Sequence, residues 1–289
     1  MEELGKRDEL SEITNLIETF EKVLEWLEKL GIRTDIGRIA AYRQYFSELI
    51  DVPKNETILT IHRANISREL FELVWIYQNF LDYDSEKIIN HVKKTLKGVV
   101  AINLEKANDQ SSRNYLFELR AASYFIKAGY KIDLDSDCDL IAYNDKEKIY
   151  VECKRLSSKD KITERIKEAS KQLDKRLSQD SSKNTYGIIW IDLSFVQMNY
   201  TGFYSAYFRR TCQFAARTDL MILTSQNIPN IDFNKRIIGL VSQTLYPGIS
   251  EIPKGYYTGS TISLKPLNKS FFKRRKFKNI MDNLLKNFG

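Results

Sequence analysis

The feature that most constrains this chain is a pair of apolar, β-rich runs, 138–143 and 148–155, separated by a polar tetrapeptide, 144–147. This pattern predicts a β-hairpin. A symmetric hairpin centred on the tetrapeptide pairs residues whose numbers add to 291. Asp139 and Glu152 are then directly opposite each other, with Cβ atoms roughly 5 Å apart on one face of the sheet.

Lys154 follows Glu152 by two residues, so the alternation of a strand puts it on the same face. Two carboxylates that face each other repel, and over an apolar sheet they are also poorly solvated. A divalent cation between them removes both costs, and a neighbouring lysine suits a site where a water loses a proton beside a phosphate. The alternatives are a solvent-exposed hairpin face and a decayed site, in which these residues bind nothing.

Charge is divided unevenly between the two parts of the chain. Residues 1–110 contain 15 Lys and Arg against 20 Asp and Glu, whereas residues 111–289 contain 30 against 18. The basic part also contains the predicted hairpin, which favours a polyanionic partner such as nucleic acid. A basic surface that only aids solubility is the alternative.

Composition excludes several other classes of protein. With 289 residues, 43% of them hydrophobic, the chain can bury a substantial core. It contains neither an uncharged apolar run of the ~18 residues that a membrane span needs nor a secretory h-region, so we expect a cytoplasmic protein with no membrane partner. Its three cysteines form no Cys-x-x-Cys pair, so we expect reduced thiols.

The N-terminal region, 1–108, is predicted to be all α-helical. Apolar residues at helical spacing predict helices over 8–30, 36–50, 64–82 and 85–97. No chemistry is evident in this region, so we expect it to contact a protein partner, form a homodimer or select the target.

The next predicted helix, 112–128, contains a glutamate on its packing face. Basic residues repeat every seven positions and predict the solvent face of this helix: Arg113, Arg120 and Lys127. Glu118 is about 140° from Arg113 and shares its face with Ala121, Ala122 and Phe125. A buried carboxylate needs a partner, for which a metal, a water or Lys154 would serve. The alternative is a glutamate at the edge of the stripe that is capped by Arg113 or Asn114.

The remaining segments complete an α/β domain over 109–289. The patterns predict strands at 130–134, 186–193, 219–224, 236–243 and 256–263, with helices at 160–177 and 201–217. The order of strands and helices predicts a mixed β-sheet flanked by helices.

Two basic segments are candidates for nucleic-acid contact. The outer face of helix 160–177 bears Lys167, Lys171 and Lys175, while Gln172 borders its apolar stripe. The C-terminal extension, 265–289, contains eight Lys and Arg but one acid. We expect contact with nucleic acid from its run Lys273, Arg274, Arg275 and Lys276, together with Arg155 of the hairpin. An anionic membrane surface is the alternative for the extension.

These residues resemble the PD-(D/E)xK phosphodiesterase superfamily, which has the restriction-endonuclease-like fold. The resemblance covers residues 110–195 and is carried by Glu118, Asp139 and the triplet Glu152-Cys153-Lys154. Cys138 stands where the family name expects proline.

The resemblance implies a Mg²⁺-dependent endonuclease that hydrolyses DNA, with Mn²⁺ as a substitute, in a restriction or phage-defence system. Asp139, Glu152 and the Cys153 carbonyl would hold the metal, while Lys154 would orient the attacking water or offset charge on the phosphate. Glu118 would support a second metal or a water, and Gln172 would support the site. Two alternatives remain: a nuclease that acts on RNA, and an inactive nucleic-acid-binding or assembly module of the same fold.

Overall fold

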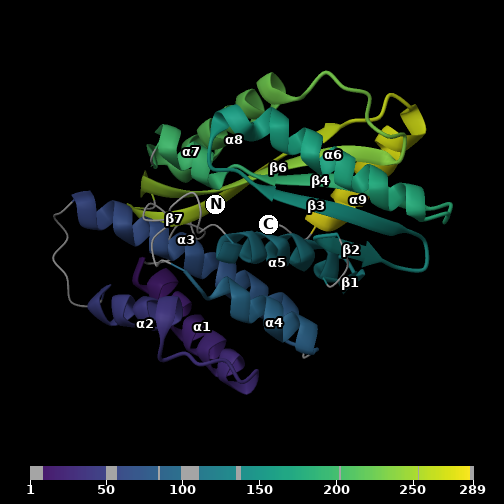
Figure 1. Cartoon of the computed structure of the whole chain (residues 1–289). Helices are drawn as coiled ribbons and strands as arrows, with labels where there is room; N and C mark the ends of the chain where they lie inside the picture. Colours follow the sequence, from purple (N-terminus) through teal and green to yellow (C-terminus); the bar gives the residue numbers. More distant parts are fainter. Residues whose placement is uncertain are drawn as a thin grey trace. The chain divides into compact units, whose positions relative to one another are not determined.

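The computed structural model describes residues 9–49, 57–83, 85–98, 111–134, 138–201, 203–252 and 254–286. Its elements are nine α-helices, seven strands and a short 3-10 helix within these ranges (Figure 1). In chain order they are α1 Glu9–Lys29, α2 Gly37–Leu49, α3 Thr57–Phe80, α4 Glu86–Thr95, α5 Ser111–Lys127, β1 Lys131–Asp133, β2 Leu140–Tyr143, β3 Lys148–Arg155, η2 Lys159–Lys161, α6 Ile162–Gln179, β4 Thr185–Asp192, α7 Ser194–Thr201, β5 Tyr204–Phe208, α8 Arg209–Asn227, β6 Ile237–Ile252, β7 Lys254–Pro266 and α9 Phe271–Leu285.

The strands form one mixed sheet among the described residues, so the predicted α/β class with a helix-flanked mixed sheet is confirmed. Its order is β1-β2-β3-β4-β6-β5, and β7 also pairs with β6. β1, β2 and β3 are antiparallel neighbours, whereas β3, β4 and β6 run parallel. The parallel strands are long apolar runs, as expected for strands covered on both faces.

By its contacts the chain divides into two compact units. The first comprises 1–112, 201–216 and 245–260, and the second comprises 113–200, 217–244 and 261–289. In the first unit, α1 packs against α3, where Trp26 and Tyr77 meet edge to face. The predicted domain boundary at 108/109 lies outside the described residues.

The second unit contains every candidate site residue. One face of its sheet packs on α6, whose apolar side is fully buried: Ile162, Ile166, Ala169, Leu173 and Leu177. The opposite face packs on α5, where Tyr124 contacts Trp190 at a ring distance of 5.2 Å. α9 covers the same face, since Phe277 fills the space over Gly239 of β6.

The segment after residue 200 differs from the sequence-based prediction. Residues 204–208 form strand β5, so the predicted helix over 201–217 begins too early. Residues 219–224 lie within α8, so the strand predicted there is wrong. A short apolar run does not distinguish a strand from part of a helix, and here the longer helix is formed.

Candidate functional site

The hairpin of β2 and β3 has the predicted register. Leu140 pairs with Val151 and Tyr143 with Lys148, so each pair adds to 291. The turn is closed by Asn144, whose side-chain oxygen accepts hydrogen bonds from the amides of Lys146 and Glu147 at 2.9 and 3.1 Å. The sequence therefore fixes the pairing through turn chemistry as well as through the apolar pattern.

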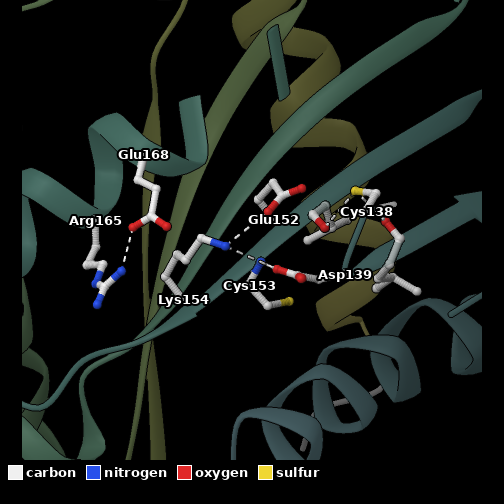
Figure 2. A network of polar contacts seen from close by, with 9 residues as sticks. Cys138, Asp139, Glu152, Cys153, Lys154, Arg165 and Glu168 are labelled. Atoms are coloured by element: carbon white, nitrogen blue, oxygen red, sulfur yellow. Dashed lines mark hydrogen bonds and ion pairs between the residues drawn. The ribbon is translucent and has the colours of Figure 1, made fainter. Parts of the chain in front are cut away.

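The register brings three polar side chains together on the face that α6 covers. Asp139 directly precedes β2, and its Oδ2 accepts a hydrogen bond of 2.8 Å from the Cys153 amide. The Lys154 Nζ lies 3.1 Å from the Glu152 Oε2 and 3.5 Å from the Asp139 Oδ2. Figure 2 shows the ammonium between the two carboxylates. The predicted meeting of Asp139, Glu152 and Lys154 is thus present in the structure.

Burial makes the charge on Glu152 unfavourable. Its side chain is 1% exposed, and this burial, reinforced by Asp139, raises its pKa to about 7 although Lys154 opposes the shift. Burial also disfavours the charged form of Lys154, but the carboxylates of Asp139 and Glu152 outweigh it and raise the lysine pKa. One ammonium therefore serves two carboxylates, and a negative charge remains when both are ionised.

The donor set fits a hard divalent cation. The Glu152 Oε1 is buried and accepts no hydrogen bond from a nitrogen or hydroxyl group of the described residues, although the Cys138 thiol, a weak donor, interacts with the carboxylate. Both main-chain groups of a strand residue point to the same edge, so the Cys153 carbonyl points to the edge where its amide meets Asp139. The described residues contain no cluster of three or more His, Cys, Asp or Glu side chains for a metal. Two carboxylates, a carbonyl and water suit Mg²⁺, which retains several waters in proteins.

The raised pKa of Glu152 predicts an unusual dependence of stability on pH. The carboxyl of the folded protein has a pKa of about 7, above the 4.5 of the unfolded chain. Between these values the folded state keeps a proton that the unfolded state has lost, so the free energy of unfolding falls as pH rises. Glutamine does not titrate, so Glu152→Gln should abolish this contribution to the decrease. In metal-free buffer the contribution is up to roughly 3 kcal/mol.

Urea denaturation of wild type and Glu152→Gln at pH 5 and pH 8 measures this effect, because the contributions of titrating groups remote from Glu152 cancel in the difference. The variant should be the more stable protein at pH 8. Equal stability of the two proteins at both pH values would contradict the burial of a charged Glu152.

Glu118 lies on α5, on the other face of β3 from Glu152. Phe125 contacts Trp190 at 6.1 Å, so the packing face predicted for this helix is confirmed. Glu118 is half-buried. The pKa of Cys153 is raised mainly by burial, then by the charge of Asp139, and to a smaller extent by the charge of Glu118. Glu118 is therefore within electrostatic range of Cys153 at the end of the hairpin.

The solvent face predicted for α5 is wrong for two of its three basic residues. Arg113 and Arg120 are each 3% exposed, although Lys127 is exposed as expected. Arg120 forms a 3.1 Å ion pair with Asp192 at the end of β4. The heptad spacing identifies a stripe of cations, but it cannot show that a carboxylate 72 positions later in the sequence buries one of them.

Arg155 also forms an ion pair with Asp192. Its side chain is 4% exposed, its Nε lies 3.9 Å from the Asp192 Oδ2, and its guanidinium lies over the Phe195 ring. Burial disfavours the ionised form of Asp192, but Arg120 and Arg155 outweigh it and lower the pKa. A guanidinium held in this way is poorly placed to contact a phosphate, so we do not propose Arg155 as a nucleic-acid-binding residue.

The α6 candidates are exposed on the outer side of the helix. Lys167, Lys171, Gln172 and Lys175 are all accessible to a partner. Sequence reasoning missed Glu168, which forms a 2.6 Å ion pair with Arg165. Figure 2 shows this pair beside Lys154, and Gln172 follows Glu168 by four residues on the same flank. The opposite charges of Arg165 and Glu168, three residues apart on a predicted helix, were the sequence signal for this ion pair.

The basic run of α9 lies elsewhere in this unit. Lys276 forms an ion pair with Glu147 in the hairpin turn and lies over the Tyr186 ring at 5.5 Å. Both contacts are at the start of β3 and β4, whereas Lys154 is near the end of β3. Lys273, Arg274 and Arg275 therefore lie at the opposite end of these strands from the carboxylates.

No protein-family model, curated protein or solved structure matches this chain. In the described part of the chain, no helix is long and apolar enough to cross a bilayer.

Proposed function

We propose that the chain is a divalent-metal-dependent endonuclease of the PD-(D/E)xK type that hydrolyses phosphodiester bonds in DNA. The observation that supports this most strongly is the cluster of Asp139, Glu152 and Lys154, in which two carboxylates share one ammonium and the buried Glu152 Oε1 accepts no hydrogen bond from a nitrogen or hydroxyl group of the described residues. A bound Mg²⁺ offsets the negative charge of the two carboxylates and accounts for the buried oxygen.

Each residue has a separate role in this proposal. Asp139, Glu152 and the Cys153 carbonyl would hold the cation, which would supply polarisation of the scissile phosphate and a lower pKa for a bound water. The side chain of Asp139 is 28% exposed, so the cluster is open to a phosphate on the side of this residue. Once the carboxylates are engaged, the Lys154 ammonium orients the attacking water and stabilises charge that develops on the phosphate oxygens.

Charge supports a nucleic-acid substrate. The part of the chain that contains the cluster bears 30 Lys and Arg against 18 Asp and Glu, and the cations on the outer side of α6 are exposed. We assign Lys167, Lys171 and Lys175 to phosphate contact, with Gln172 as a supporting residue. Glu118, on the other face of β3, supports the site only through its charge near Cys153. DNA is the proposed substrate, and RNA is the comparison substrate in the test, since no feature of the site reports on a 2′-hydroxyl.

A binding or assembly module without turnover is the rival function. The ion pairs of Lys154 with both carboxylates favour it, because they also stabilise the cluster without a cation. This rival predicts salt-dependent binding of nucleic acid without cleavage.

Incubation with supercoiled plasmid, linear duplex, single-stranded DNA and RNA tests the proposal. We expect nicked or linear products with Mg²⁺ or Mn²⁺, and none with EDTA. Binding without cleavage under all these conditions would leave the rival function in place.

A further inference from the structure

Two adjacent aromatic rings at the start of α9 are exposed. Phe271 and Phe272 are 71% and 81% accessible, and their rings lie edge to face at 6.1 Å. The apolar side of the same helix is buried against the sheet through Phe277, Ile280, Met281 and Leu284. The core of this unit therefore does not use the first two rings.

Cations directly follow these rings in the first turn of α9. The Lys273 ammonium and the Asn268 side chain both donate to the main-chain carbonyl of Lys235, and the Arg274 Nε donates to the Asn268 carbonyl at 2.9 Å. Burial and the neighbouring charges of Arg236 and Lys235 lower the pKa of Lys273. Main-chain carbonyls make these contacts, and they leave the positive charge available to an anion.

We propose that this aromatic–basic patch, defined by Phe271, Phe272, Lys235, Lys273 and Arg274, binds unpaired bases of single-stranded DNA. The phenylalanine rings stack on bases while the cations contact the flanking phosphates. Base faces are hidden within a duplex, so the rings favour a strand that is unpaired. The inference rests on nucleic acid as the partner in the proposed function, but not on the metal site.

The packing of α9 favours this partner over an anionic membrane. A helix at a membrane surface inserts a continuous apolar face into the lipid. Here that face is already buried, and only two rings at one end of the helix are left for lipid. Two rings among cations are sufficient to hold bases and phosphates of a single strand.

The patch is separated from the candidate cleavage site along the parallel strands. The Arg236 carbonyl accepts a hydrogen bond from Gly187, which pairs with Tyr150 of β3. Lys154 lies four residues further along β3, or about 13 Å in the strand direction alone, and it is on the face that α6 covers, whereas α9 packs on the opposite face. A substrate that reaches both would be DNA with an unpaired segment that is separated from the bond that is cut.

Fluorescence anisotropy with labelled oligonucleotides tests this proposal in EDTA, where cleavage has no part. The probes are a 20-nucleotide oligothymidine and a 20-base-pair duplex. We expect the double variant Phe271→Ala, Phe272→Ala to weaken single-strand binding about tenfold or more, with less than a threefold change for the duplex. The matched control Met221→Ala, Ile222→Ala removes two exposed apolar side chains of α8 and should change neither.

Three outcomes would overturn the inference. The aromatic variant could bind the single strand like wild type, or it could lose single strand and duplex equally. It could also keep DNA binding and lose binding to phosphatidylserine vesicles, which would assign the patch to a membrane. Absence of DNA binding by the wild type would instead remove the partner of the proposed function, so the two failures are distinguishable.

Discussion

Replacement of Lys154 by alanine is expected to reduce Mg²⁺-dependent cleavage of DNA by roughly 10³-fold, because loss of one preorganised electrostatic group at a reacting centre costs this much. The same change should leave Mg²⁺ affinity unchanged or increased. The ammonium lies 3.1 Å from Glu152 and 3.5 Å from Asp139, so it competes with a cation for the same carboxylates. Lys154→Ala therefore separates metal binding from turnover.

Two further variants complete this test. Asp139→Asn should lose both cleavage and metal binding, because it removes a proposed ligand. Lys183→Ala makes the same change of charge at an exposed position and should retain both activities. Cleavage rates on plasmid DNA and calorimetric titration with Mg²⁺ provide the two measurements. Cleavage by Lys154→Ala at the wild-type rate would remove this residue from the chemistry.

Replacement of Asp192 by alanine is expected to lower the free energy of unfolding by about 3–5 kcal/mol, the usual cost of leaving a buried charge uncompensated. Asp192 is 3% exposed, and both Arg120 and Arg155 depend on it. It also accepts a 2.9 Å hydrogen bond from the Ser194 amide, at the first residue of α7. The variant leaves two guanidinium groups in the interior without this carboxylate.

The exposed pair of Arg165 and Glu168 provides the control for this prediction. Each side chain is more than 40% exposed, and removal of such a pair changes stability by about 1 kcal/mol or less. Urea denaturation midpoints of Asp192→Ala and Glu168→Ala give the comparison. A loss of stability for Asp192→Ala no greater than that for Glu168→Ala would contradict the buried network.

The hairpin could be predicted because its information is local. Asp139 and Glu152 are 13 positions apart in the sequence, and the polar turn between two apolar runs defines a single centre of pairing. The face shared by Asp139, Glu152 and Lys154 follows from that register. The order of α5, the hairpin, α6 and β4 was predictable for the same reason, since each element has its own periodicity.

The burial of Arg120 and Arg155 could not be predicted in this way. Both interact with Asp192, at the end of a strand that is distant from them in sequence. Periodicity gives the polarity of a helix face but not the identity of the group that packs against it. A lone aspartate at the end of the long apolar run of β4 was the signal that a buried cation would be needed.

The exposed arrangement around α9 also depends on long-range contacts. The sequence predicts a basic terminal helix, and α9 is present at Phe271–Leu285. Only the fold shows that Lys276 pairs with Glu147 while Phe271 and Phe272 are exposed. Which cations of a basic segment face a partner is determined by the surface on which the helix packs.

The location of a bound Mn²⁺ ion shows whether Asp139 and Glu152 form a metal site. Crystals soaked in Mn²⁺ should give an anomalous peak within about 2.0–2.4 Å of oxygens from Asp139, Glu152 and the Cys153 carbonyl, in the range for oxygen ligands of such cations. The Lys154 ammonium should then have moved away from at least one carboxylate. A map without this peak at saturating Mn²⁺, with Lys154 still between Glu152 and Asp139, would contradict the account.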